Sequence, residues 1–381
     1  MIIVNRLPPF QLEEYFRRYS FQPGMVNLSP SNPISPTIGE VLELAGLPLS
    51  ALGAVSLDYS ETAGARQLRQ AVAELYDDLD PAQVIVTNGA VEAIAIGLAA
   101  LVEPGTRVVL ENPIYGSYEP LLHLLGAEVT RYELAAGEAF EYDFDRLEAL
   151  VASSRSELVT VNPYNNPTGR GLTSASALEA LCELSARLGC KVVCDEVFRH
   201  VSLEGEPLPS ALDVTDAAVA IGDMTKAWGL GGLRIGWLAS RDTALLERAL
   251  TTRDFTTNSN SSVSEVLAEL ALSVRGQLLE AALSRARGTL AVLHAFIADS
   301  RGALSWSPPV GGYCGFIEVH GTSAKSVPQL CAELAESQSY LFLPGAVFGP
   351  QWDRFLRVGL AAGGERLAAG LGAFVEVAGL A

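Results

Sequence analysis

A lysine in a glycine-rich turn is the residue of this chain best suited to nucleophilic chemistry. The sequence has three lysines, Lys191, Lys226 and Lys325. Lys226 lies between two apolar runs in the segment IGDMTKAWGLGGLRIGW (residues 221–237), eight residues before Arg234. A primary amine held among glycines and apolar residues can have a lowered pKa and attack an aldehyde. The segment alone also fits a solvated surface lysine, so the rest of the chain must decide.

Four other clusters offer complementary chemistry. Gly89 precedes a helical stretch, whose first backbone N–H groups, those of Ala90 and Val91, can face an anion. Tyr115 can stack on a planar ring. Two prolines and paired asparagines make residues 162–169 a rigid loop that aims the Asn166 amide inward. Asp195 ends an apolar run and needs a cationic partner there. Each cluster alone also has a structural explanation, such as a turn, a core aromatic or a helix cap.

Short apolar runs alternate with helical stretches, and these must position the clusters. Strands are predicted at residues 84–87, 107–110, 158–161, 192–194 and 217–221, each followed by one of the five polar segments. This alternation predicts an α/β fold with a mostly parallel sheet covered on both faces. Ligands bind at the carboxyl ends of the strands in such sheets. The five segments are therefore expected to share one edge.

The remaining segments suggest a second, smaller unit. A helix is predicted at 11–19, a Pro/Ser/Asn-rich arm at 27–37, helix over 64–79 and 263–298, a strand at 316–319, and a C-terminal helix within 360–381. We expect an N-terminal arm contributing to the small domain (1–45), a large cofactor-binding domain (46–255) and a small C-terminal domain (256–381).

Composition narrows the class of protein. The 381 residues carry a net charge of -18, which argues against binding to nucleic acid or an anionic membrane surface. No apolar run approaches the roughly 18 residues of a membrane span. Residues 1–9 lack the order of regions seen in a signal peptide. The five cysteines show no zinc or disulfide spacing, so we expect a cytoplasmic protein with reduced thiols and no metal site.

Together the clusters supply an anion cup, a stacking ring, an amide, a carboxylate and an amine, the set that pyridoxal 5′-phosphate requires. In this set and its order, over roughly residues 27–360, the chain resembles fold type I pyridoxal-phosphate enzymes, specifically class I/II aminotransferases. The resemblance implies a large domain with a mostly parallel mixed sheet between helices, plus a smaller α/β domain. It also implies an aminotransferase that passes an amino group from an amino acid to a 2-oxo acid.

The resemblance further implies a role for each matching residue. Lys226 would form the Schiff base and move the substrate's Cα proton, and Asp195 would pair with the pyridine nitrogen. Asn166 would bind the ring oxygen and Tyr115 would stack on the ring. The phosphate would be held at Gly89, Ala90 and Val91 and by Arg234. Arg357 would clamp the substrate carboxylate. Tyr59 would reach the phosphate of a neighbouring subunit, which makes a homodimer with shared sites the expected assembly. Side-chain selection is expected from Ser31 and Asn32, the Tyr115 loop and residues 256–262.

Two positions depart from the family pattern. Phe198 stands where a tyrosine usually donates to the ring oxygen, and Asp223 stands where a serine or threonine usually contacts the phosphate. Thr225 could supply that hydroxyl instead. Similar departures occur in arginine oxidases and capreomycidine-type cyclases, so the alternative is an oxidase, cyclase or lyase acting on arginine or another cationic amino acid in specialised metabolism. A non-catalytic sensor and a nicotinamide-binding protein fit less well, since the lysine and carboxylate are intact and no acidic residue follows the glycines at the expected distance.

Overall fold

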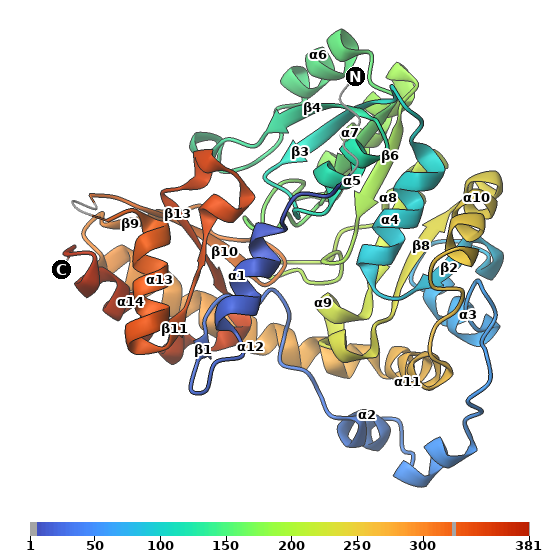
Figure 1. The fold of residues 1–381 in the computed structure, drawn as a ribbon, viewed down its shortest axis with the longest axis horizontal. Helices are drawn as coiled ribbons and strands as arrows, with labels where there is room; N and C mark the ends of the chain where they lie inside the picture. The colour runs from blue at the N-terminus through green and yellow to red at the C-terminus, as the bar shows by residue number, and fades with distance from the viewer. Residues whose placement is uncertain (1–5, 322–324, 381) are drawn as a thin grey trace.

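The centre of the molecule is a seven-stranded sheet, seen in the computed structural model, which describes residues 6–321 and 325–380 (Figure 1). In their order across the sheet, the strands are β2 (Val84–Thr87), β8 (Gly236–Ser240), β7 (Ala218–Asp223), β6 (Lys191–Asp195), β5 (Leu158–Val161), β3 (Arg107–Asn112) and β4 (Glu128–Glu133). Strand β8 runs antiparallel to both its neighbours, and every other adjacent pair is parallel. The predicted mostly parallel α/β sheet is confirmed.

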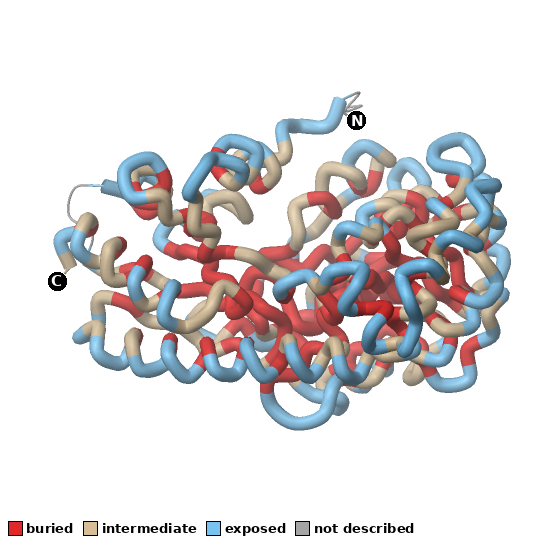
Figure 2. Tube along the Cα trace, turned by 90° about the horizontal axis from the view of Figure 1, so that it is seen from below, coloured by how far each residue is buried: buried red, intermediate tan, exposed pale blue. Residues whose placement is uncertain are grey.

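Both faces of this sheet are covered by helices, because alternate side chains of each buried strand point to opposite faces. In β2, for example, Ile85 packs in one core while Val84 and Val86 pack in another. The core with Ile85 is completed by α4 (Ala90–Leu101), α5 (Tyr118–Leu124) and α10 (Thr243–Asp254). The other face is covered by α3 (Arg66–Ala73), α6 (Phe144–Ser154), α7 (Ala175–Leu188) and α8 (Ala211–Val214). Figure 2 shows the buried residues concentrated in the interior.

A smaller α/β unit adjoins the large sheet. Its four-stranded antiparallel sheet has the order β12 (Leu343–Pro344), β13 (Phe355–Gly359), β10 (Cys314–Val319) and β9 (Leu304–Trp306). The accompanying helices are α12 (Arg275–Asp299), α13 (Val327–Gln338) and α14 (Gly364–Val377), whereas α11 (Ser262–Ser273) packs against α3 of the large unit. Helix α12, 25 residues long, extends from the large sheet to this unit (Figure 1).

The N-terminal segment joins this smaller unit. After α1 (Gln11–Tyr19), strand β1 (Val26–Asn27) pairs in parallel with β11 (Tyr340–Leu341), and α2 (Ile38–Leu44) follows. The expected division into an N-terminal arm with part of the small domain (1–45), a large domain (46–255) and a small domain (256–381) stays a prediction.

Several element boundaries differ from those predicted. The helix expected over 64–79 is only α3: Gly64 adopts φ +93° and turns the chain before it, and residues 74–78 form a turn after it in which Asp78 adopts φ +51°. The helical region 263–298 is two helices that meet at Val274. Strands β4 and β8 were not predicted; β4 is half exposed and polar, as an edge strand can be.

The described residues include no helix that is long and apolar enough to cross a membrane. Of residues 1–9, on which the prediction about a signal peptide was made, residues 1–5 lie outside the described part of the chain.

Candidate active site

The carboxyl ends of the strands open into a cavity of about 320 Å³ between the large sheet and the smaller unit. Its predicted site residues are Ala90, Val91, Tyr115, Asn166, Asp195, Phe198, Asp223, Thr225, Lys226, Arg234 and Arg357. It is also lined by Leu12, Glu13, Phe16, Ser31, Ile94, Asn162 and Val197. The expectation that the polar segments share one edge is met, since they come from the ends of β2, β3, β5, β6 and β7.

Lys226 projects into this cavity from α9 (Met224–Trp228). Asp223, the last residue of β7, starts the helix: its Oδ1 accepts hydrogen bonds from the backbone N–H groups of Thr225 and Lys226, both at 3.0 Å. Lys226 Nζ donates to Ser31 Oγ at 3.0 Å and lies 5.8 Å from the centre of the Phe198 ring. Burial lowers the pKa of Lys226, although the carboxylate of Asp223 opposes the shift. A lowered pKa increases the fraction of neutral, nucleophilic amine.

The other two lysines have conventional partners. Lys191 Nζ pairs with Asp242 Oδ2 at 2.6 Å, and Lys325 Nζ pairs with Glu333 Oε2 at 2.5 Å. Both ammonium groups are partly exposed and form an ion pair with a carboxylate at the surface. Lys226 is thus the lysine whose surroundings favour nucleophilic chemistry.

Asp195 is a buried carboxylate that makes no ion pair with the residues of the described structure. It is 4% exposed at the end of β6, where Oδ2 accepts from the Tyr118 hydroxyl at 3.0 Å and Oδ1 from the Val197 N–H at 3.3 Å. Burial raises the pKa of Asp195 to about 7, and those two hydrogen bonds oppose the shift. Burying a carboxylate without a cation is costly. The site therefore fits a ligand that brings its own positive charge, such as a protonated ring nitrogen.

An anion cup lies at the start of α4. Gly89 has φ +82° and precedes the free N–H groups of that helix, and a Cβ at Gly89 would collide with the Arg234 guanidinium. Arg234 donates to the Asn88 and Gly231 carbonyls at 3.3 and 3.2 Å and forms no ion pair within the described part of the chain. A helix N-terminus beside an unpaired guanidinium suits a phosphate.

Arg357 and Asn166 meet on the opposite side of the cavity. Arg357 comes from β13 of the smaller unit and is 1% exposed, and its Nη1 donates to Asn166 Oδ1 at 2.9 Å. Its Nη2 donates to the Ser29 carbonyl at 2.8 Å, and the described residues supply no carboxylate partner. The buried Arg357 guanidinium can donate two parallel hydrogen bonds to a carboxylate. Tyr115, beside it, packs edge-on against Phe10 at 5.4 Å.

Some predicted residues lie outside the cavity lining. Gly89 lies behind Arg234. Tyr59 is 85% exposed. The Asn32 amide donates to the Pro33 carbonyl, and residues 256–262 do not line the cavity; Ser31 does. The roles assigned to Tyr59 and Asn32 stay predictions.

Sequence reasoning missed the contribution of α1. Leu12 and Phe16 lie one helical turn apart and line the cavity together with Glu13 between them. Their spacing marked an apolar stripe on the predicted helix 11–19. It did not show that this stripe would face residues that follow the strands of the large sheet, far along the chain.

The sequence also matches known proteins over almost its full length. The family model described as aminotransferase class I and II matches residues 25–368. The chain belongs to this family. Capreomycidine synthase from Streptomyces vinaceus is 32% identical over 98% of this chain and 94% of that protein. Aspartate aminotransferase from Thermotoga maritima is 27% identical over 90% of this chain and 88% of that protein.

Solved structures of this family show the same fold. The PLP-dependent cyclase OrfR superposes with a TM-score of 0.90 at 31% identity, covering 99% of both chains. A PLP-dependent aminotransferase from Streptococcus suis superposes with a TM-score of 0.89 at 26% identity, covering 98% of both. The family member described here therefore has the fold type I architecture, and its cofactor is pyridoxal 5′-phosphate.

The residues present fit this cofactor. Among the residues that the structure describes, Asp195 has no cationic partner and Arg234 has no anionic one, and Lys226 is an amine with a lowered pKa; all three line one cavity. These are the complements of a ring nitrogen, a phosphate and an aldehyde.

Proposed function

We propose that this protein is a pyridoxal-phosphate enzyme that acts on an α-amino acid with a cationic side chain, with a reaction that continues at Cβ or Cγ by elimination and cyclisation. The observation that carries the proposal is a pair of carboxylates, Glu13 and Asp223, lining the same cavity as Lys226 and Arg357. Neither carboxylate forms an ion pair with the residues that the structure describes. Unpaired carboxylates in a cavity favour a cationic ligand group.

The cofactor, when bound, supplies an electron sink that stabilises negative charge at the substrate's Cα. Asp195 would hold a proton on the ring nitrogen and so maintain that capacity. Arg234 and the start of α4 would bind the phosphate, and the Asn166 amide would bind the ring oxygen. Arg357 would hold the substrate's α-carboxylate and thereby orient its Cα toward the Lys226 amine.

Lys226 is the group in this cavity suited to take the Cα proton. Its Nζ bonds to the Ser31 hydroxyl and faces the Phe198 ring, which has no hydroxyl to donate. The neutral amine favoured by burial can accept a proton and return it. A tyrosine at position 198 would add a donor beside the ring oxygen, and this chain does without it.

The proposed reaction balances without an oxidant or reductant. Lys226 takes the Cα proton, and a leaving group X on Cβ or Cγ departs as HX. A side-chain nitrogen of the substrate forms a bond to the carbon that lost X and gives up its own proton. Cα regains a proton from Lys226. The product is the substrate minus HX, closed into a ring.

The comparisons support this outcome without deciding it. Capreomycidine synthase and the cyclase OrfR share 32% and 31% identity with this chain. Transamination is the second candidate, because the family match and the aspartate aminotransferase from Thermotoga maritima support it equally. It would use the same residues, with Lys226 again taking the proton from Cα but not returning it there.

A substrate panel separates these candidates. The cofactor-loaded enzyme is mixed with arginine, lysine, hydroxylated arginines, neutral and acidic amino acids, and binding is followed by cofactor absorbance. Mass spectrometry then detects ring-closed products, keto acids, peroxide and the aminated cofactor. We expect cationic amino acids to bind best and a ring-closed product to form without amination of the cofactor. Amination of the cofactor together with release of a keto acid would establish transamination and contradict the first candidate.

Two substitutions test the carboxylates directly. Glu13→Gln and Asp223→Asn should each weaken binding of cationic amino acids about tenfold, the loss of one charge-assisted contact. Binding of neutral amino acids should stay the same. Glu14→Gln, in the same helix but exposed, is the matched control. Equal losses for neutral and cationic amino acids would contradict a charge-selective role.

We also propose a homodimer in which Tyr59 of one subunit contacts the phosphate of the other. Tyr59 is 85% exposed, and apolar Leu49 and Leu57 nearby are 68% and 86% exposed, which leaves an unburied face on the segment before α3. Sedimentation should show a dimer. Tyr59→Phe should weaken cofactor binding by a few-fold and leave the dimer intact. A monomer with full cofactor affinity would contradict this assembly.

A further inference from the structure

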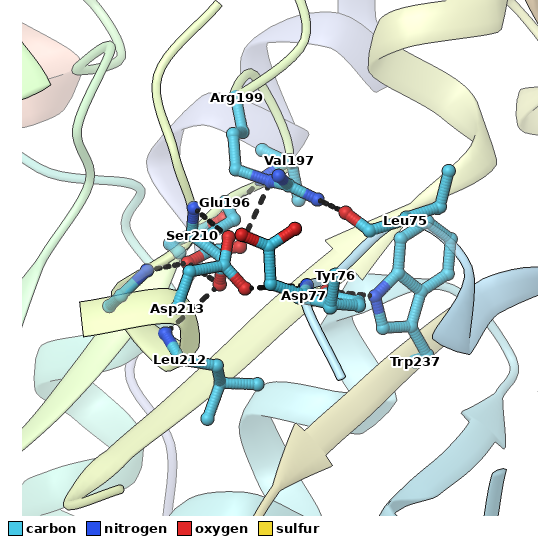
Figure 3. Close-up of polar contacts among 12 residues, drawn as sticks. Leu75, Tyr76, Asp77, Glu196, Val197, Arg199, Ser210, Leu212, Asp213 and Trp237 are labelled. Carbon is cyan, nitrogen blue, oxygen red and sulfur yellow. Dashed lines mark hydrogen bonds and ion pairs between the residues drawn. The ribbon is translucent and has the colours of Figure 1, made fainter. Parts of the chain in front are cut away.

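The turn after strand β6 has two faces. On one face, Asp195 and Phe198 line the cavity. Glu196 and Arg199 do not line it; they belong to the buried polar cluster in Figure 3. The same turn thus presents the Asp195 carboxylate to the cavity and directs the Glu196 carboxylate toward partners within the chain.

Glu196 and Arg199 form a buried ion pair with further partners. Arg199 Nε lies 3.2 Å from Glu196 Oε2, and the two side chains are 8% and 2% exposed. Glu196 Oε1 accepts from the Ser210 hydroxyl at 2.7 Å and from the Ala211 N–H at 2.8 Å. Arg199 Nη2 donates to the Leu75 carbonyl at 2.7 Å. The pair therefore ties the turn to two separate segments of the chain.

Those two segments are themselves connected (Figure 3). Asp213 accepts from the Asp77 N–H at 2.9 Å and from the Ser210 N–H at 2.8 Å. The Arg199 guanidinium lies 4.8 Å from the centre of the Tyr76 ring, whose hydroxyl accepts from Trp237 Nε1 at 2.6 Å. The charges of the cluster, on Glu196, Arg199 and Asp213, thus each meet complementary groups among the described residues.

Asp195, in contrast, has its backbone anchored but its carboxylate held by only two hydrogen bonds. The Asn162 amide donates to its carbonyl at 2.7 Å, while the carboxylate accepts from the Tyr118 hydroxyl and from the Val197 N–H in the same turn. Its position therefore depends on the conformation of residues 195–199. That conformation includes the backbone bonds from Glu196 N to the Ile221 carbonyl, at 2.7 Å, and from Arg199 N to the Glu196 carbonyl, at 2.9 Å.

We propose that the Glu196–Arg199 ion pair is a positioning device that holds the Asp195 carboxylate and the Phe198 ring at the cofactor. The proposal rests on the role assigned to Asp195 in the proposed function. The ion pair fixes the turn from behind, as outer partners orient the direct ligands of a metal. Removing one partner leaves the other charge buried without compensation, so the turn must rearrange.

The test compares four variants of the full-length protein. Glu196→Gln and Arg199→Lys disturb the ion pair. Asp213→Asn disturbs the same cluster away from the turn and is the matched control. Asp195→Asn removes the carboxylate itself. Three quantities are measured: the dissociation constant of pyridoxal phosphate, the pH dependence of the bound cofactor's visible absorbance, and the urea midpoint of the cofactor-free protein.

We expect Glu196→Gln and Arg199→Lys to raise the cofactor's dissociation constant about tenfold, as losses of outer partners do at metal sites. Both should shift the pH profile of the bound cofactor in the same direction as Asp195→Asn. Asp213→Asn should lower the urea midpoint but leave the pH profile unchanged. General destabilisation reduces the folded fraction and cannot alter the profile of the cofactor that stays bound, so the profile isolates positioning from stability.

The outcomes that overturn the proposal are distinct from those that overturn the proposed function. A lower urea midpoint with an unchanged pH profile in Glu196→Gln would make the ion pair purely structural. An unchanged profile in Asp195→Asn would instead remove Asp195 from the cofactor site. Should Glu196→Gln and Arg199→Lys both fail to fold, Ser210→Ala removes one hydrogen bond to Glu196, together with the cap that Ser210 Oγ provides to the Leu212 N–H, and leaves both charges of the ion pair in place. It should shift the profile in the same direction, and an unshifted profile there would contradict the proposal.

Discussion

The two faces of the turn after β6 differ in where their charges find partners. On the cluster side, Glu196 meets Arg199 within the chain. On the cavity side, Asp195 is equally buried but meets no cation among the described residues. Two arginines beside the anion cup also differ in their partners: Arg253 is fully buried and pairs with Glu92 at 3.3 Å, while the exposed Arg234 pairs with no carboxylate in the described structure. Buried charges that pair within the chain hold the fold together, and unpaired charges that line the cavity mark the places where a ligand completes the site.

The two arginines give the largest expected effect. Arg253→Gln leaves Glu92 buried without its partner, so it should lower the free energy of unfolding by about 3–5 kcal/mol. Arg234→Gln should change the stability of the cofactor-free protein by no more than about 0.5 kcal/mol. It should instead weaken cofactor binding. Urea unfolding of the cofactor-free proteins and cofactor titration measure the two effects, and a reversed pattern would break the comparison.

Arg357 extends the comparison between paired and unpaired charges to the part of the cavity where the substrate is proposed to bind. Arg357→Lys keeps the charge but loses the fork, so kcat/KM for an accepted amino acid should fall about 100-fold, mainly through KM. The exposed Arg354→Lys is the control, with Arg354 3.6 Å from Glu318. Steady-state kinetics provide the measurement. An unchanged KM in Arg357→Lys would show that the substrate carboxylate binds elsewhere.

The pH dependence of stability should show the cost of the unpaired carboxylate. Because burial raises the pKa of Asp195 to about 7, the folded cofactor-free protein binds a proton that the unfolded chain releases above its ordinary pKa of 3.8. This contribution to stability is fully present below pH 3.8 and is lost as pH rises toward 7, by up to about 4 kcal/mol.

Asp195→Asn should flatten this part of the stability–pH curve, and saturating cofactor should flatten it too, because a ring cation favours the charged carboxylate. Urea midpoints between pH 5 and 8 measure the slope. The neighbouring Glu111, whose pKa burial raises to about 8, adds a slope of the same sign, so the difference between wild type and Asp195→Asn is the quantity to compare. An identical slope in both proteins would contradict the raised pKa of Asp195.

Much of the fold was predictable, since local patterns fix it. Apolar runs bounded by Asn-Gly and Asn-Pro marked strands β2, β3 and β5, and the residues that follow them had to meet at one edge. The sequence did not reveal β4, whose polar residues suit an edge strand, or the break at Val274, which depends on how α11 and α12 pack.

The cavity residues that directly follow a strand were predictable from the sequence. Lys226, Asp195 and Asn166 lie where their position after a strand placed them. Glu13 was missed because its contact with the cavity depends on where α1 docks, which no local pattern fixes. Asp223 was noted as a departure, but its bonds to two backbone N–H groups explain it first as the cap of the lysine helix. Its second role, toward a cationic substrate, is what the proposed function adds.

The most direct test asks which lysine binds the cofactor covalently. The protein loaded with pyridoxal phosphate is reduced with borohydride, which fixes the cofactor on the amine that carries it, and is then digested and mapped by mass spectrometry. We predict the pyridoxyl group on the Lys226 peptide, with Lys191→Ala labelled like the wild type and Lys226→Ala unlabelled. A pyridoxyl group on Lys191 or Lys325, or normal labelling of Lys226→Ala, would contradict the account.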